Sequence, residues 1–126
     1  MLDFESQYLL FRHASPRETY QDGASLFDIG DVGDVMYVVK SGSVELSIGD
    51  TLVETVGPGG AFGEMALIDA SPRSASAMCV GETELVPISL ERFKFLVQAA
   101  PEFSIAIMKT MADRLRARTR HMAVKN

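Results

Sequence analysis

The chain has no tryptophan, a single cysteine and two histidines among its 126 residues, and these scarcities exclude several kinds of site. One thiol, Cys79, cannot form an internal disulfide, and its place in an alternating stretch predicts a small buried residue. His13 and His121 lie at opposite ends of the sequence, so no histidine cluster of the metal-binding type is present. We therefore predict no metal site and no cofactor.

A nucleophile with a neighbouring base is also missing from the sequence. Ser71, Ser74 and Ser76 lie close together, but neither they nor Cys79 has a histidine nearby in the chain. A serine or thiol is a weak nucleophile without such a base or a lowered pKa. We predict from this that the protein is not an enzyme.

Long apolar runs and a basic leader are absent as well. The longest apolar runs are far too short to span a bilayer. Residues 1–5 lack the basic start and the apolar core of a signal peptide. These absences predict a cytoplasmic protein that does not associate with a membrane.

Positive charge is scarce over most of the chain. The formal net charge is −5, because 17 acidic residues outnumber 12 basic ones. Nucleic-acid binding needs a basic face that displaces phosphate counterions, so this balance argues against it. Basic residues do gather near the C-terminus, where we interpret them as cations at a helix end and on its solvated face, with a weak nucleic-acid role as the alternative: Lys109, Arg114, Arg116, Arg118, Arg120 and Lys125.

Turn residues divide the rest of the chain into short segments of one domain, spanning residues 1–126. We expect a helical segment over residues 1–17, an antiparallel β-roll over 18–89 and helices over 89–126. Two joints, Ser41-Gly42 and Gly49-Asp50, carry two-residue hairpin signals, although loops of three or four residues fit almost as well. The β-rich runs end at Gly, Asp or Pro and predict strands over residues 25–29, 36–40, 43–48, 51–56, 74–80 and 84–89.

Helical patterns lie on both sides of the β-rich region. A first helix is predicted over residues 3–12, and a second opens at Ser89 with Glu91 just inside it. Pro101 divides the C-terminal helical region. Beyond it an apolar stripe recurs every four residues and packs either on the roll or on a second copy of the chain: Phe103, Ile107, Met111 and Leu115, joined by Met108 and Met122.

Residues 62–77, FGEMALIDASPRSASA, place a carboxylate and a guanidinium nine positions apart around a predicted bend. Gly63 lets the backbone approach a ligand, and the amides of the turn that follows are free to bind an anion. Arg73 offers a planar fork for two phosphate oxygens. Glu64 accepts hydrogen bonds, so beside a phosphate its natural partner is a sugar hydroxyl. The pattern predicts a small phosphate ligand, with a structural Glu64–Arg73 ion pair or two solvated charges as the alternatives.

A nucleoside triphosphate fits this sequence poorly. The segment Gly57-Pro58-Gly59-Gly60 is not followed by Gly-Lys-Ser/Thr, so we interpret it as a turn and not as a Walker motif. ATP would also require a lysine and a magnesium site. A cyclic phosphodiester carries one negative charge, which a single arginine and a few amides can match.

Residues 62–68 and 72–75 resemble the phosphate-binding cassette of the cyclic nucleotide-binding domain family, with no gap between its halves. The similarity extends to residues 23–27, 30–39 and 42–46 and covers nearly the whole chain. It implies a mainly β fold, a jelly-roll-like β-roll with an N-terminal helix, a short cassette helix and two C-terminal helices. It also implies cAMP as the ligand, with cGMP second.

The resemblance further implies roles for the cassette residues. Arg73 pairs with the cyclic phosphate, and Glu64 accepts a hydrogen bond from the ribose 2′-hydroxyl. Amides around Gly63, Ala66 and Ser74 complete the anion site. Met65 and Ala75 are the remaining ligand-binding residues of this segment.

For the base, the resemblance implies positions on the roll and on the last helix, which closes as a lid. The roll contributes Leu46 and Val56. The lid contributes Arg118 and Thr119. The hydroxyl of Ser74 suits either the phosphate or a guanine amino group, so the choice between cAMP and cGMP stays open.

The chain ends about where the DNA-reading helix-turn-helix of the catabolite-activator regulators would begin, and it has no kinase or channel segment. We therefore expect a sensor whose last helix responds to ligand and acts through an unknown effector protein or a homodimer. A ligand-independent dimerisation or scaffold module is one alternative. A cupin-type metal enzyme, which is also a small β-roll, is the other.

Overall fold

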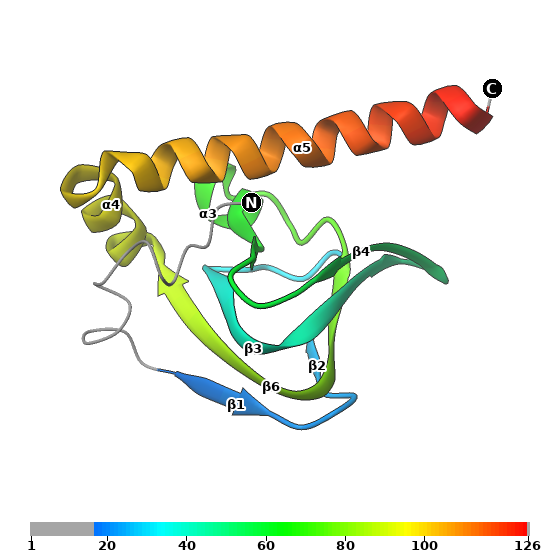
Figure 1. Cartoon of the computed structure of the whole chain (residues 1–126), viewed down its shortest axis with the longest axis horizontal. Coiled ribbons are helices and arrows are strands. Elements are labelled where there is room, and N and C mark those ends of the chain that lie inside the picture. Colours follow the sequence, from blue (N-terminus) through cyan, green and yellow to red (C-terminus); the bar gives the residue numbers. More distant parts are fainter. Residues whose placement is uncertain (1–16, 126) are drawn as a thin grey trace.

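The structure is a computed structural model that describes residues 17–125. Six strands form one antiparallel sheet that curls into a roll, and helices pack at one side of it (Figure 1). This architecture confirms the mainly β fold predicted from the sequence, while the helix predicted over residues 3–12 lies outside the described residues. The elements are β1 (Glu18–Tyr20), β2 (Ser25–Phe27), β3 (Val35–Ile48), β4 (Thr51–Val56), β5 (Ala61–Phe62), α3 (Glu64–Asp69), β6 (Ser76–Ser89), α4 (Leu90–Ala99) and α5 (Pro101–Lys125).

Two long strands, β3 and β6, form the centre of the sheet and pair from Val35↔Ser89 to Ser47↔Ser76. The order is β1-β6-β3-β4, with β2 beside β6 and β5 beside β3. A hairpin at Ser41-Gly42 was predicted, and this prediction is wrong, because β3 continues through both residues. The predicted strands 36–40 and 43–48 are thus one strand, as are 74–80 and 84–89, which merge into β6.

Gly42 explains why the chain bends here without reversing. Its φ is 78°, and a Cβ at this position would lie 2.5 Å from the Glu82 carbonyl oxygen and from Thr83 Oγ1. Only glycine tolerates both the left-handed backbone and so close an approach. The register of β3 on β6 shifts on both sides of Ser41, so the glycine produces an irregularity in a long bent pair. The other hairpin signal, Gly49-Asp50, is confirmed as the turn between β3 and β4.

The C-terminal helices begin where capping chemistry predicts. Ser89 is the N-cap of α4, and its hydroxyl oxygen accepts a hydrogen bond from the Arg92 amide at 3.1 Å. The second helix, α5, begins at Pro101, which suits the first position of a helix because its missing N–H would be unpaired there anyway. No helix within residues 17–125 is long and apolar enough to cross a membrane.

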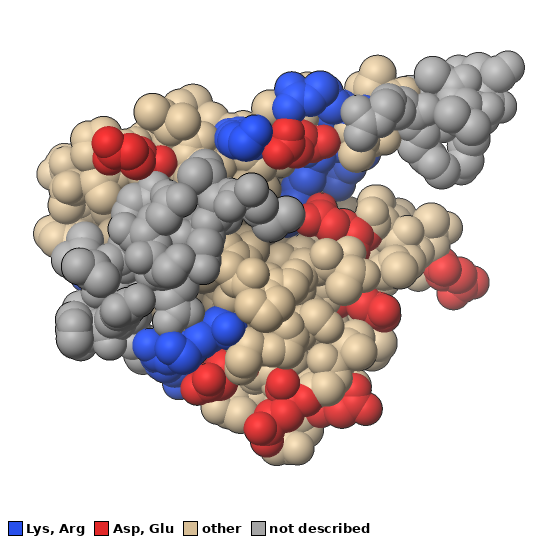
Figure 2. Space-filling model, viewed as in Figure 1, with Lys and Arg blue, Asp and Glu red and all other residues tan. Residues whose placement is uncertain are grey.

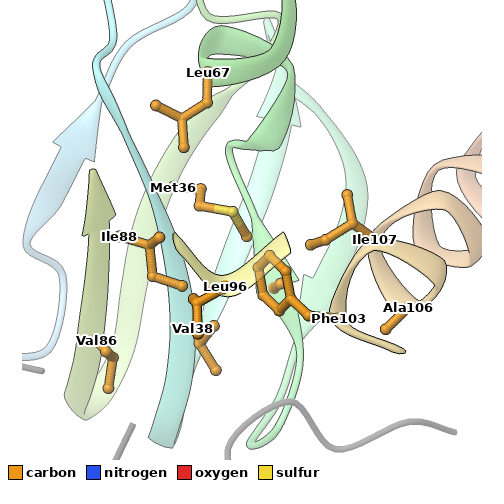
Figure 3. Packing of buried hydrophobic residues seen from close by; sticks show 10 residues of the cluster. Met36, Val38, Leu67, Val86, Ile88, Leu96, Phe103, Ala106 and Ile107 are labelled. Atoms are coloured by element: carbon orange, nitrogen blue, oxygen red, sulfur yellow. The ribbon is translucent and has the colours of Figure 1, made fainter. Parts of the chain in front are cut away.

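Two clusters of buried residues hold these elements together. The first joins the sheet to α4 and α5, with side chains from both sides pointing toward one another in Figure 3. Its members include Met36, Ile88, Leu96, Phe103 and Ile107. The second fills the roll and contains Val39, Val44, Val56, Phe62, Ala77, Cys79 and Leu85, so the prediction of a buried Cys79 is confirmed.

The apolar stripe predicted on α5 divides between two faces. Phe103 and Ile107 are buried against the sheet and Met111 is half-buried, whereas Leu115 is 67% exposed. Each step of four residues turns by about 40° around a helix, so Leu115 lies about 120° from Phe103. Met108 is also exposed, and Met122 belongs to the part of α5 whose side chains are not described.

Candidate functional site

The segment 62–77 runs from the end of β5 through α3 and a loop into the start of β6. Gly63 follows β5 with φ 83° in the left-handed region, and α3 begins at the next residue. Ala70 ends the helix with φ 59°, and the Asp69 carboxylate accepts hydrogen bonds from the amide and the hydroxyl of Ser71. These bonds from the Ser71 hydroxyl and amide lower the pKa of Asp69. The loop after α3 brings Arg73 back to Gly63.

Arg73 is tied at its backbone to the loop between β2 and β3. Its amide donates to the Asp31 carbonyl at 2.8 Å, and its own carbonyl accepts from the Gly30 amide at 2.8 Å. The side chain turns inward and is 6% exposed. Nη1 donates to the Gly63 carbonyl at 3.1 Å, and Nη2 donates to the Val35 carbonyl at 2.7 Å. The guanidinium is thereby held in place by backbone groups.

Aromatic stacking and burial complete the surroundings of Arg73. Its Cζ lies 4.1 Å from the ring centre of Phe27, within cation–π range. Burial lowers the pKa of the guanidinium below its usual value, against the opposing effect of Tyr37, Asp34 and other nearby acids. Within residues 17–125, the buried Nε of Arg73 has no hydrogen-bond partner. A buried cation with an unpaired donor is costly alone and well suited to an anionic partner.

Gly33 leaves the space that this guanidinium occupies. A Cβ at position 33 would lie 2.3 Å from Arg73 Nε and 2.4 Å from Cζ. A Cβ at Gly63 would lie 2.7 Å from Nη1 of the same side chain. Both glycines are therefore required for the observed position of Arg73.

Glu64 is buried at 4% exposure and pairs with Arg114 of α5, not with Arg73. The distance from Arg114 Nη1 to Glu64 Oε1 is 2.7 Å. The alternatives of a Glu64–Arg73 ion pair and of two solvated charges are both wrong, because both Nη groups of Arg73 donate to carbonyls and both side chains are buried. Arg73 and Glu64 are nevertheless neighbours, since Nη1 of Arg73 contacts the residue before Glu64.

Arg114 was interpreted as one of several solvated cations, and its position corrects that interpretation. Besides Glu64, it contacts Glu54 of β4 through Nε at 2.7 Å and Nη2 at 3.1 Å, and Nη2 also donates to the Ala61 carbonyl at 2.6 Å. Burial alone would lower its pKa, but the Glu54 hydrogen bond and the charges of Glu64 and Glu54 outweigh this and raise it. Figure 2 shows basic and acidic side chains next to one another where α5 approaches the roll.

The remaining predicted site residues differ in how far they are buried. Ala66, Ala75 and Val56 are buried, Leu46 is half-buried, and Met65 and Ser74 are exposed. Leu46 lies directly opposite Glu54 in the β3–β4 pair. Arg118 and Thr119 are exposed on α5, where the Thr119 hydroxyl donates to the Leu115 carbonyl at 3.0 Å.

Sequence reasoning missed Glu54 and Phe27 and gave Arg114 no part in the site. A signal for Arg114 does exist. Position 114 is eleven residues after Phe103, which places it about 20° from Phe103 around the helix. Arg114 therefore lies on the same face of α5 as the buried Phe103, whereas Leu115 is exposed. No comparable signal marks Glu54, because four of the six residues of β4 are exposed and a carboxylate is ordinary in such a strand. Among the described residues, no group of three or more His, Cys, Asp or Glu side chains can hold a metal ion.

Comparison with known proteins adds to this geometry. The sequence model of the cyclic nucleotide-binding domain matches residues 17–100. The cyclic AMP receptor protein of Thermus thermophilus is 37% identical over 105 residues, which are 79% of this chain and 49% of that protein. The catabolite activator protein structure of the same organism superposes with a TM-score of 0.82 at 31% identity, covering 95% of this chain and 59% of that one.

A kinase regulatory domain is similar as well. The regulatory domain of Toxoplasma gondii PKA, solved with cAMP, has a TM-score of 0.65 at 31% identity and covers 78% of this chain and 40% of that chain. The chain thus spans about half of the Thermus receptor protein. Because the family model covers most of the chain, from β1 through α4, this protein belongs to the cyclic nucleotide-binding domain family.

Proposed function

We propose that the domain binds a cyclic nucleotide, with cAMP preferred over cGMP, at the site formed by Arg73 and Glu64. The observation that carries this proposal is the buried Arg73 guanidinium, whose Nε lacks a partner and whose Nη1 contacts Gly63, next to Glu64. The phosphate pairs with Arg73, and the ribose 2′-hydroxyl donates to Glu64. Amides around Gly63, Ala66 and Ser74 complete the anion site.

The charges at the site favour a ligand with one negative charge. The Arg114 cation is already matched by two carboxylates, Glu54 and Glu64, whereas the guanidinium of Arg73 is bonded to neutral carbonyls. A cyclic phosphodiester therefore matches the charge of Arg73. Leu46 and Val56 hold the base from the roll, and Arg118 and Thr119 approach it from α5.

Calorimetric titration tests this function directly. We expect saturable binding of cAMP, weaker binding of cGMP and a rise in melting temperature with each, because a ligand that binds the folded state alone stabilises it. The noncyclic 5′-AMP, with a second negative charge, is the control and is expected to bind more weakly. No heat and no melting shift with cAMP or cGMP at millimolar concentration would favour the scaffold alternative.

The output proposed for this site is a sensor that is not catalytic. A cyclic nucleotide-binding domain is a binding module, so the prediction that the domain is not an enzyme is confirmed. Ligand binding shifts the position of α5 if the nucleotide binds the domain more tightly with α5 in one position than in another. The effector protein is unknown, and the cytoplasmic location stays a prediction.

A second copy of the chain is the partner that α5 suits. Ile105, Met108 and Leu115 are 59%, 59% and 67% exposed, and their spacing of three and seven residues places them on one face. In a heptad this spacing puts Ile105 at an a position and Met108 and Leu115 at successive d positions. We propose that two copies pair along this face.

Leu115→Glu is expected to weaken self-association by about tenfold or more, because a buried a or d position does not accept an unpaired charge. Sedimentation velocity over a concentration series measures the dissociation constant. Val32→Glu is the matched control, since Val32 is 95% exposed on a loop far along the chain from α5. A wild-type protein that stays monomeric at all concentrations would contradict the pairing.

A further inference from the structure

The fork of Arg114 binds two carboxylates on different edges of its guanidinium plane. Nε and Nη2 hold both oxygens of Glu54, at 2.7 and 3.1 Å, while Nη1 holds one oxygen of Glu64 at 2.7 Å. The third partner is the Ala61 carbonyl, which accepts a second hydrogen bond from Nη2. Arg114 therefore joins β4, the start of β5 and α3 to α5.

The two carboxylates share this cation unequally. Glu54 uses both oxygens, a bidentate contact that sets the plane of the guanidinium. Glu64 uses Oε1 alone, and among residues 17–119, whose side chains the structure describes, no hydrogen bond reaches its Oε2. Oε2 thus has its full capacity to accept a hydrogen bond from another molecule.

The place of Glu54 in the sheet puts it beside the proposed ligand. It is directly opposite Leu46 across the β3–β4 pair, and two residues from Val56 on the same strand. Side chains two apart on a strand share a face, so Glu54 and Val56 point to the same side of β4. Its side chain is 38% exposed, whereas that of Glu64 is 5% exposed.

We propose that Glu54 is a positioning residue for the sugar: it holds Arg114 so that Glu64 gives up one oxygen to α5 and keeps Oε2 for the ribose 2′-hydroxyl. This inference rests on the proposed function. Without the Glu54 charge, the freed edge of the guanidinium turns toward Glu64 and binds both of its oxygens. The sugar hydroxyl then competes with Arg114 for Glu64.

The ratio of the dissociation constants of 2′-deoxy-cAMP and cAMP tests this role, because it isolates the 2′-hydroxyl. A hydrogen bond to a charged group predicts a ratio of about 10 to 100 in the wild type. Glu54→Gln keeps the size of the side chain and removes its charge, and we expect the ratio to fall at least threefold. Glu45→Gln, on the neighbouring strand, is the matched control and leaves the ratio unchanged. An unchanged ratio in Glu54→Gln overturns the proposal.

A double-mutant comparison separates positioning from a general loss of stability. In Arg114→Ala, Glu64 has no competing partner from α5, so adding Glu54→Gln is expected to leave the ratio as it is in Arg114→Ala alone. A further fall in the double variant would show that Glu54 acts without Arg114, which contradicts the proposal.

A measurement without nucleotide keeps this inference distinct from the proposed function. We expect Glu54→Gln to speed hydrogen exchange of the α5 amides around Arg114 by about fivefold, the amount that one half-exposed ion pair accounts for. Glu45→Gln should not change it. Unchanged exchange in Glu54→Gln shows that Glu54 does not position Arg114, whatever binds. Faster exchange together with a wild type that binds neither nucleotide upholds the anchor and refutes the proposed ligand.

Discussion

Arg73→Ala is expected to weaken cAMP binding by about 2 to 5 kcal/mol, or roughly 30- to 5,000-fold, because it removes the buried cation that we propose as the partner of the phosphate. In the structure, Arg73 is 6% exposed and fixed by the carbonyls of Val35 and Gly63 and by the ring of Phe27. The guanidinium is therefore preorganised and needs little ordering when ligand binds. Isothermal calorimetry measures the loss, and equal affinity of variant and wild type would show that the site lies elsewhere.

Two further variants distinguish charge from geometry at this position. Arg73→Lys keeps the charge but not the planar fork, so we expect an affinity between those of wild type and Arg73→Ala. Arg116→Ala is the matched control, because Arg116 is exposed on α5 and pairs with Asp113 of the same helix. Its affinity should equal that of the wild type. Melting temperatures measured in parallel show whether each variant is folded.

Gly33→Ala provides a test that leaves every charged group in the chain intact. The added Cβ would lie 2.3 Å from Arg73 Nε, so the guanidinium has to move away from its carbonyl partners. We therefore expect weaker cAMP binding in a folded protein, in the same direction as Arg73→Ala. This variant distinguishes the position of the cation from its presence.

Local chemistry made the starts of the two C-terminal helices predictable from the sequence. Ser89 and Pro101 carry signals that act within one helical turn, and the structure begins α4 and α5 at those signals. The two hairpin signals show the limit of such reasoning. Gly49-Asp50 and Ser41-Gly42 are both glycine-containing pairs, but pairing with β6 on either side of Gly42 keeps β3 continuous. That pairing is a property of residues about 40 positions away.

The candidate site shows the same limit in its side chains. The sequence motif indicated that Arg73 and Glu64 belong together, but it did not reveal their partners. Glu64 contacts Arg114 fifty positions later, and Arg73 is held by carbonyl groups, which every residue possesses. Backbone acceptors carry no signature in a sequence, and so the alternative of a Glu64–Arg73 ion pair could not be excluded without the fold.

Phe103→Ala is expected to destabilise the domain by about 3 to 5 kcal/mol, the usual cost of emptying a buried aromatic position. Phe103 is fully buried where α5 meets the sheet, and its ring packs edge-to-face on Phe93 at 5.5 Å. Denaturant unfolding measures the loss. Phe95→Ala is the matched control on α4, because Phe95 is 48% exposed, and we expect a loss below about 1 kcal/mol. Equal losses would contradict this packing.

The same substitution should also reach the ligand site, because Phe103 and Arg114 share one face of α5. Phe103 joins the start of this helix to the sheet, and Arg114 joins its middle to β4 and α3. Loosening the first attachment leaves α5 held by Ile107 and by the Arg114 contacts, so we expect Phe103→Ala to weaken cAMP binding as well as folding. Saturating cAMP should then restore less stability to Phe103→Ala than to the wild type at the same nucleotide concentration, since ligand stabilisation follows the ratio of concentration to dissociation constant.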